Sequence, residues 1–106
     1  MDGDSRLYPR LRTRLRPGKL VSNEGGFLAD CAIIDRSTRG ARLRFFDDTA
    51  RPEHFSLLDE VEGVMQPARL VWSAGSEAGA CFTGLREVPE AAELARVSGR
   101  YYAVER

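Results

Sequence analysis

Two stretches in the first half of the chain carry an apolar residue at every second position. In FLADCAIID, residues 27–35, the apolar positions of one face are Phe27, Ala29, Cys31 and Ile33. In ARLRFF, residues 41–46, the corresponding positions are Ala41, Leu43 and Phe45. Successive side chains of a β-strand point to opposite faces of the sheet. This period of two therefore predicts two half-buried strands.

Four further apolar runs have the length of strands and are separated by Gly-rich or charged turn sequences. They are residues 18–22, 54–58, 64–73 and 80–85. Six short strands at intervals of roughly 8–12 residues predict an antiparallel sandwich or a small barrel. Closure of the sheet into a barrel would remove its exposed edges.

One stretch has the pattern of a helix. In PEAAELARVS, residues 89–98, Pro89 and the acidic residues after it suit a helix start, and Gly99 suits its end. Because the helix is short, packing must stabilise it. We expect Leu94, together with Ala91 or Ala95, to dock this helix on the strands.

The length of 106 residues indicates one domain. We divide residues 1–106 into an N-terminal arm (1–14), a β-barrel (18–86) and a C-terminal helix (89–99). No run approaches the roughly 18 apolar residues of a membrane span. We therefore expect a cytoplasmic protein that does not interact with membranes. We also expect it to be a monomer or a weak homodimer.

Charge is distributed unevenly, although 16 basic and 16 acidic residues give a net charge of zero. Residues 1–44 contain ten basic and five acidic residues, whereas residues 45–106 contain six and eleven. The segment SRLYPRLRTRLRPGK, residues 5–19, holds five arginines and Lys19 but no acid. Such asymmetry indicates an anion-binding end of the molecule, and arginine is suited to bidentate recognition of phosphates and bases.

The sequence offers little for catalysis or metal binding. His54 is the only histidine, and we expect it to be a partly buried structural residue. Cys31 and Cys81 are fifty residues apart, lack a CxxC arrangement and are expected to be structural. The acid pair Asp59–Glu60 is expected to lie solvated in a loop. We therefore expect neither an enzyme nor a cofactor or metal site.

Two short motifs remain as candidates for binding. The first is RLYPR, residues 6–10, in which Tyr8 precedes a proline and is biased toward an extended conformation. At about 3.3 Å per residue, Arg6 and Arg10 would stand on one side of the chain about 13 Å apart. The same spacing occurs at Arg10–Arg14 and Arg12–Arg16. We prefer the first frame because of its Tyr-Pro context and its distance from the first strand.

The second motif is DRSTRG, residues 35–40, at the end of an alternating strand. Asp35 is a hydrogen-bond acceptor, Ser37 supplies a hydroxyl, and Gly40 is conformationally permissive. By itself the motif is typical of a turn, in which Asp and Ser cap the corner and Gly adopts a positive φ.

Together the two motifs resemble the RxxxR and (D/N)xSxxG signature of PilZ domains, with 24 residues between Arg10 and Asp35. The strand pattern resembles single-domain alphaproteobacterial members over nearly the whole chain. The resemblance implies a six-stranded antiparallel β-barrel with a short C-terminal helix that binds cyclic di-GMP. It further implies that Arg6 and Arg10 come from a flexible arm that wraps over the ligand. Asp35, Ser37 and Gly40 would line the outer face of the barrel.

The chemistry of these residues suits that ligand. Arginine can form bidentate bonds with guanine or phosphate and stack over a base. Asp35 can accept a hydrogen bond from a guanine N–H, Ser37 can contact a base edge or a phosphate, and Gly40 permits close approach. Two positions depart from the family pattern. Ser5 stands where many members have a further arginine, and Arg39 stands where glycine is common.

Two other functions are compatible with the sequence. A PilZ-fold adaptor without a nucleotide would act only by binding a protein partner, although the charged motif positions are intact. A small barrel that binds RNA or single strands needs aromatic platforms beside its basic groove. Tyr8 is the only aromatic residue in the arginine-rich segment, so we do not expect a nucleic-acid partner. The leading expectation is a cyclic di-GMP-binding regulator that signals to an unidentified protein partner.

Overall fold

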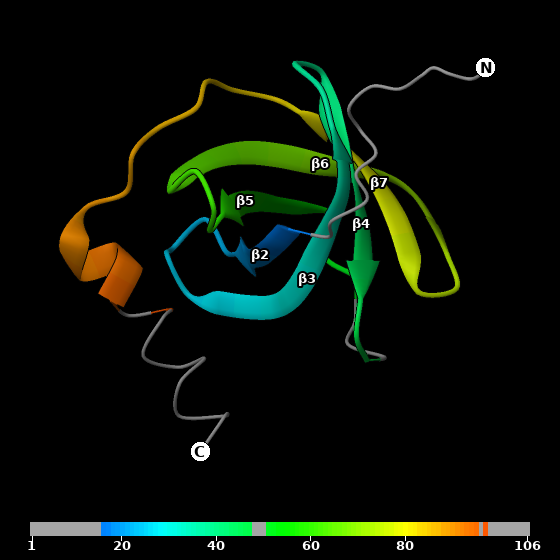
Figure 1. Cartoon of the computed structure of the whole chain (residues 1–106), viewed down its shortest axis with the longest axis horizontal. Coiled ribbons are helices and arrows are strands. Elements are labelled where there is room, and N and C mark those ends of the chain that lie inside the picture. Colours follow the sequence, from blue (N-terminus) through cyan, green and yellow to red (C-terminus); the bar gives the residue numbers. More distant parts are fainter. Residues whose placement is uncertain (1–15, 48–50, 96, 98–106) are drawn as a thin grey trace.

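Six strands follow one another in the part of the chain that the computed structural model describes, residues 16–47, 51–95 and 97. They are β2 (Arg16–Val21), β3 (Phe27–Arg36), β4 (Gly40–Phe45), β5 (His54–Asp59), β6 (Val64–Ala74) and β7 (Glu77–Phe82). Every neighbouring pair is antiparallel, and the strand order β2-β3-β4-β7-β6-β5 closes because β5 pairs with β2. Figure 1 shows the strands curving around a common interior. The predicted six-stranded antiparallel barrel is confirmed.

The interior of the barrel is filled by the alternating apolar residues of all six strands. Small side chains from β3, β4, β6 and β7 leave room for the larger ones of β2, β4 and β5. The predicted inward face of β4 is confirmed, since Ala41, Leu43 and Phe45 are all buried. The complete interior cluster is Leu20, Ala29, Cys31, Ile33, Ala41, Leu43, Phe45, Phe55, Leu57, Ala68, Ala78 and Ala80.

The turn between β6 and β7 is shorter than its sequence indicates. The sequence predicts a strand at 80–85, but β7 spans Glu77–Phe82 and Ala74 pairs directly with Glu77. The connection has only two residues, and its first residue, Gly75, has φ of 60°. A two-residue hairpin loop favours glycine at such a position. The second glycine of the segment, Gly79, belongs to the strand itself.

After β7 the chain runs around the outside of the barrel to a short helix (Figure 1), in which residues 91–95 and 97 are helical. Val97 is buried against Val21 and Leu58. Leu20 and Leu57 point into the barrel. The next residues along the two strands, Val21 and Leu58, therefore point outward. The helix consequently packs against the outer wall of the barrel. The helix therefore forms a second, smaller apolar cluster.

The residues that dock the helix are only partly those expected. Leu94 is partly buried and packs into the second cluster, as predicted. Ala91 and Ala95 are exposed, so their predicted contribution is wrong. Val97, only 2% exposed, takes that place. The helix turns this residue rather than the two alanines toward the barrel.

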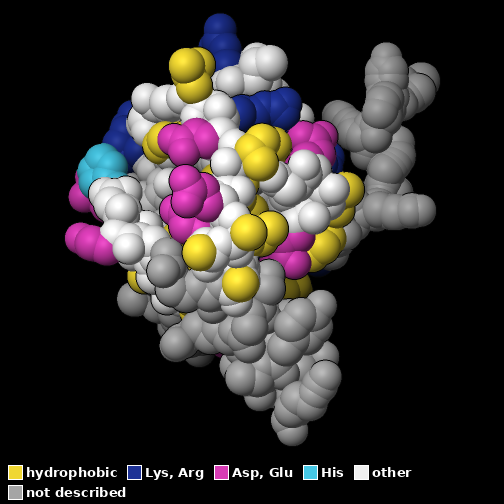
Figure 2. Space-filling model, turned by 90° about the vertical axis from the view of Figure 1, so that its left-hand side faces the viewer, with side chains coloured by type: hydrophobic (Ala, Val, Ile, Leu, Met, Phe, Trp, Pro, Cys, Tyr) yellow, Lys and Arg dark blue, Asp and Glu magenta, His cyan; other side chains and the backbone are white. Residues whose placement is uncertain are grey.

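The segment that connects β7 to the helix leaves large apolar side chains in solvent. Leu85 is 86% exposed and Val88 is 78% exposed. The segment is tied to the barrel by Met65, whose backbone exchanges two hydrogen bonds with Glu87, at 2.7 and 2.8 Å. Figure 2, which views the side of the molecule that carries this segment, shows hydrophobic and acidic side chains interspersed there.

Candidate functional site

The hairpin between β3 and β4 holds the DRSTRG motif. The backbone N–H of Ser37 donates to the carbonyl oxygen of Gly40 at 2.9 Å. The Ser37 hydroxyl oxygen accepts from the backbone N–H groups of Arg39 and Gly40, at 3.1 and 3.3 Å. Ser37 therefore closes the turn with its backbone and its side chain. The hydroxyl also donates to the carbonyl oxygen of Gly40 at 3.5 Å, a long contact that an external acceptor can replace because Ser37 is exposed.

Gly40 is required for close packing against β7 rather than for a positive φ in the turn. Positive φ angles occur at Gly25, Gly63 and Gly75 among the described residues, but not at Gly40. The expectation of a positive φ at Gly40 is therefore wrong. A Cβ atom at this position would lie 2.1 Å from the carbonyl oxygen of Ala80 on β7. Gly40 lets the hairpin lie directly against the neighbouring strand.

A bulge orients the acidic residue of the motif. The register of β3 and β4 shifts between Ile33 and Asp35, so Ile33 lies opposite Leu43 and Asp35 lies opposite Arg42. Strict alternation from Ile33 would turn Asp35 into the barrel. The inserted residue instead directs Asp35 outward and the following residue inward, as β-bulges commonly do.

The Asp35 carboxylate is only loosely engaged in the structure. Its Oδ2 atom lies 3.4 Å from Nη2 of Arg42, and both side chains are nearly half exposed. Such exposed ion pairs contribute little, about 0–1 kcal/mol. A ligand that offers a better donor to Asp35 can therefore displace Arg42.

A row of four residues crosses the outer wall from this point. Asp35 on β3 lies opposite Arg42 on β4, Arg42 opposite Gly79 on β7, and Gly79 opposite Trp72 on β6. A second register shift, between Leu70 and Trp72, sets this last pair. The row therefore combines a carboxylate, a guanidinium and an indole on one surface.

The indole of Trp72 lies flat enough on the sheet to occupy the space above a glycine. A Cβ atom at Gly79 would be 2.1 Å from its Nε1 atom. Trp72 is nevertheless 45% exposed, so part of the ring faces solvent. Sequence reasoning missed this residue. The predicted strands, 64–73 and 80–85, left Gly79 in the turn between them, so its pairing with Trp72 could not be read from the sequence.

Further arginines surround the row. Arg39 lies in the hairpin turn, and its carbonyl oxygen accepts from the N–H of Phe82 at the end of β7. Arg69 lies opposite Cys81, which itself lies opposite Gly40. Both arginines are exposed, and neither forms an ion pair with another described residue. This outer surface is consequently cationic around Trp72.

The arginine arm joins the barrel beside the hairpin. Arg6 and Arg10, and the whole predicted arm 1–14, lie outside the described residues. The first described residue, Arg16, pairs with Ile33, two residues before Asp35. The described barrel therefore begins beside the strand that leads into the motif of Asp35, Ser37 and Gly40.

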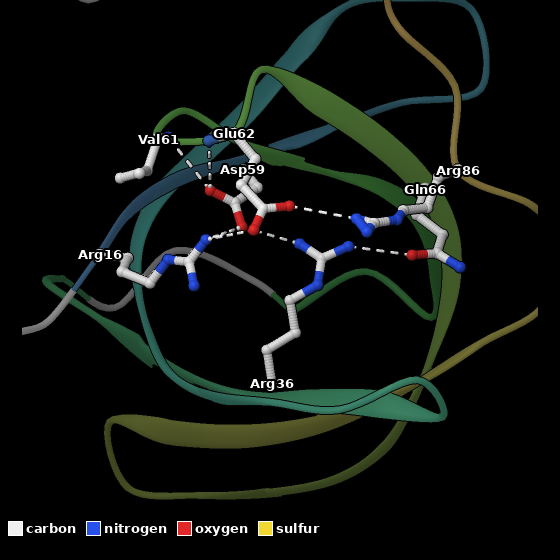
Figure 3. Close-up of polar contacts among 7 residues, drawn as sticks. All are labelled: Arg16, Arg36, Asp59, Val61, Glu62, Gln66 and Arg86. Carbon is white, nitrogen blue, oxygen red and sulfur yellow. Dashed lines mark hydrogen bonds and ion pairs between the residues drawn. The ribbon is translucent and has the colours of Figure 1, made fainter. Parts of the chain in front are cut away.

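Beneath the hairpin, the barrel interior contains a polar network that sequence reasoning did not anticipate (Figure 3). Asp59 was expected in a solvated loop, but it is the last residue of β5 and is fully buried. Its Oδ2 atom accepts from Arg16 at 2.8 Å and from Arg36 at 2.9 Å. Its Oδ1 atom accepts from the backbone N–H groups of Val61 and Glu62, at 3.1 and 3.2 Å. The period of β5 could have revealed it, since Phe55, Leu57 and Asp59 share one face.

Lys19, the single lysine of the basic segment, also has a structural role, because it is buried and paired with two acidic residues. Its side chain is 1% exposed, and Nζ lies 2.7 Å from Asp30 and 2.8 Å from Glu60. Burial lowers the pKa of Lys19, but the hydrogen bonds to these two carboxylates outweigh it, so the pKa is raised above 10.5. Lys19 is therefore a structural cation on the outside of β2.

The remaining candidate residues have simple surroundings. His54 is exposed, with 58% of its side chain accessible, so the expected partial burial is wrong. Cys31 is buried in the barrel, and this burial raises the pKa of its thiol to about 12. Cys81 is partly exposed on the outer wall. Both cysteines are free thiols.

Comparison of the chain with protein-family models, with curated proteins and with solved structures gives no significant match. In the described part of the chain, no group of three or more His, Cys, Asp or Glu side chains is arranged to hold a metal ion. Nor does any described helix have the length and apolar character needed to cross a bilayer. The choice of a function therefore depends on the motifs and on the geometry of the outer wall.

Proposed function

We propose that this protein binds cyclic di-GMP on the outer wall of the barrel at the β3–β4 hairpin and acts as a PilZ-type regulator rather than as an enzyme. The main support is the pairing of Arg16 with Ile33. It starts the described barrel beside the strand that leads to Asp35 and Ser37, six residues after Arg10 in the sequence. In the proposed complex, the two halves of the PilZ-like signature, 24 residues apart in the sequence, come together on the ligand.

Each residue has a chemical role in the proposed complex. Arg6 and Arg10 bind the phosphates or the guanine edges through charge-assisted hydrogen bonds. Asp35 exchanges its loose contact with Arg42 for a guanine N–H donor. Ser37 donates its hydroxyl hydrogen to a phosphate or base oxygen. Gly40 acts indirectly, because it holds the hairpin flat against β7.

Trp72 gives the proposed site a platform for a base. The exposed part of its ring shares a surface with Arg42 and with the exposed cation of Arg69. Stacking of a base on an aromatic side chain contributes about 1–3 kcal/mol. One guanine of the ligand would stack here while its phosphates meet the arginines.

Binding should order the arm. Fixing a residue costs about 1–2 kcal/mol of conformational entropy, so contacts with the nucleotide must offset this cost over residues 6–14. The ordered arm then offers a new surface to a protein partner. Hydrogen exchange with and without cyclic di-GMP tests this step, and equal protection of residues 6–14 in both states would contradict it.

Titration calorimetry tests the function itself. The wild type should bind cyclic di-GMP but not GTP or a single-stranded oligonucleotide. Arg10→Ala and Asp35→Ala should each lower the affinity by about 1–3 kcal/mol, roughly 5- to 150-fold. Arg14→Ala is the matched control and should have little effect.

Two results would overturn this assignment. No heat with the wild type at high micromolar nucleotide would place the protein with nucleotide-free adaptors. A loss of affinity in Arg14→Ala but not in Arg10→Ala would show that the arginine frame is shifted along the arm.

A further inference from the structure

Three large apolar side chains are exposed where the segment after β7 runs beside the turn after β5. Leu85 and Val88 belong to the segment, and Val61, which is 63% exposed, belongs to the turn. Arg86 donates to Glu62 at 3.1 Å, so the residues that follow Leu85 and Val61 in the sequence are in contact. The three apolar side chains therefore occupy one region of the surface and are not scattered singly over it.

The segment that carries Leu85 is fixed on both sides of this residue. Before it, the carbonyl oxygen of Gly84 accepts from the buried side chain of Gln66 at 2.9 Å. After it, Glu87 exchanges two backbone hydrogen bonds with Met65. A surface that is already held in shape loses little conformational entropy when a partner docks on it. An ordered segment thus presents Leu85 to solvent.

The charge around these side chains is negative. Residues 83–95 contain three glutamates and a single basic residue, Arg86, which is already paired with Glu62. Glu87 and Glu90 are exposed, and neither carboxylate pairs with a cation in the described part of the chain. Figure 2 shows this mixture of hydrophobic and acidic side chains. The acidic apolar face, as we call it, consists of Val61, Leu85, Glu87, Val88 and Glu90.

The sign of this charge selects among the possible partners. A bilayer with anionic lipids would be repelled by the glutamates. A second copy of the chain that docked through the same face would bring like charges together. A segment with basic and apolar side chains would neutralise Glu87 and Glu90 and would cover Leu85 and Val88.

We propose that the acidic apolar face is a docking surface for a basic segment of a partner protein, in which lysine or arginine residues are interspersed with apolar ones. Contact with the three apolar side chains supplies most of the affinity. Attraction to Glu87 and Glu90 accelerates the encounter and favours basic partners. The proposal goes beyond nucleotide binding and does not depend on it, because the face contains none of the residues assigned to the ligand.

Fluorescence anisotropy with the full-length protein tests this docking surface. The probe is a labelled peptide composed of leucine and lysine, and its counterpart has glutamate in place of every lysine. The lysine peptide should bind, and the glutamate peptide should not. Binding should weaken as the salt concentration rises, because the glutamates of the face are exposed to solvent.

Substitutions locate the binding on the surface. Leu85→Ala should weaken the lysine peptide roughly tenfold through lost apolar burial, without a change in melting temperature. Phe46→Ala is the matched control, since Phe46 is a large apolar residue that is 66% exposed after β4. Glu87→Gln combined with Glu90→Gln should lower both the affinity and its salt dependence. Glu53→Gln, at an exposed acid before β5, should change neither.

Three results would overturn the proposal: equal binding of the lysine peptide by wild type and Leu85→Ala, equally tight binding of the two peptides, or no binding of either. Sedimentation of the protein alone covers the remaining occupant. Self-association that Leu85→Ala abolishes, without peptide binding, would assign the face to a second copy and would also overturn it. Absence of cyclic di-GMP binding would overturn only the proposed function, because the peptide measurement contains no nucleotide.

Discussion

The indole of Trp72 rests on the backbone of Gly79, at a distance that leaves no space for a β-carbon between them. This contact holds the only tryptophan of the chain on the outer wall, in line with Arg42 and Asp35. Because Gly79 has no side chain, the indole ring can lie directly on its backbone. A ring in this position can stack on a ligand, and its fluorescence can change when the ligand binds.

Replacement of Trp72 tests the platform. Trp72→Ala should lower the affinity for cyclic di-GMP by about 1–3 kcal/mol through loss of base stacking, as measured by calorimetry. Val71→Ala is the control, since Val71 is the adjacent exposed apolar residue at 50% exposure. In the wild type, tryptophan fluorescence should change on titration. An unchanged spectrum at saturating nucleotide would place the ligand away from this ring.

Substitution of Gly40 should disturb the hairpin. Gly40→Ala places a methyl group against the carbonyl oxygen of Ala80, and relief of such overpacking costs about 1–3 kcal/mol. Gly26→Ala is a matched control, because its methyl group would meet only the Ser22 hydroxyl, at 3.3 Å. Thermal unfolding should show a clearly lower melting temperature for Gly40→Ala than for Gly26→Ala. Equal melting temperatures would mean that β4 and β7 separate easily at this point.

The C-terminal helix should contribute to stability through Leu94. Because this residue is partly buried in the second cluster, Leu94→Ala should cost about 2 kcal/mol, the lower end of the range for core leucines. Leu85→Ala makes the same chemical change at a residue that is 86% exposed, and it should have almost no effect. Urea unfolding measures both. A cost for Leu85 as large as that for Leu94 would indicate that the exposed segment is covered in solution.

The two cysteines should react at very different rates. Burial raises the pKa of Cys31 to about 12, so at pH 8 hardly any of it is the reactive thiolate. Cys81 is partly exposed on the outer wall. A thiol-specific reagent should therefore label one cysteine in the native protein and two in denaturant, with Cys31→Ala retaining the fast reaction. Rapid labelling of both thiols in the native state would contradict the burial of Cys31.

Acid should weaken one link between the barrel and the segment that follows β7. Hydrogen bonds from Arg86 and from Arg16 hold the pKa of Glu62 below its ordinary value of 4.5. The folded-state pKa is depressed, so this contribution to stability is complete above pH 4.5 and is lost as the pH falls through the folded pKa. Glu62→Gln should consequently lose less stability than the wild type as the pH is lowered below 4.5. Parallel stability curves for the two proteins would show that the pairs contribute nothing.

Local sequence pattern was sufficient for most of the barrel. In β4 the strict alternation of Ala41, Leu43 and Phe45 with arginines predicted which side chains are inside. Alternation reports only local geometry, however, and a single inserted residue reverses it. The bulge before Asp35 reversed the face of that residue and of Arg36, and nothing in the local pattern marks it. The orientation of the candidate site thus depends on strand register, which is a property of the whole sheet.

Buried charge was the other feature that the sequence concealed. Asp59 was expected to be solvated in a loop, and Lys19 was counted with the anion-binding basic segment, because charged residues are rarely buried unless paired. Each is buried because partners distant in the sequence reach it: Arg36 for Asp59 and Asp30 for Lys19. Only the closure of the sheet brings these partners together. Polar residues in phase with an apolar strand face are therefore the positions at which such networks should be sought.

Closure of the barrel also restricts how another protein can recognise this one. Each described strand has a hydrogen-bonded neighbour on both sides, including β2 and β5, which complete the circle. Along the residues that are paired on both sides, an incoming chain finds no unpaired backbone groups to extend, so a partner must distinguish this part of the surface by its side chains. A few exposed side chains would then decide which of several similar barrels a partner binds. These side chains can be substituted without disturbing the sheet.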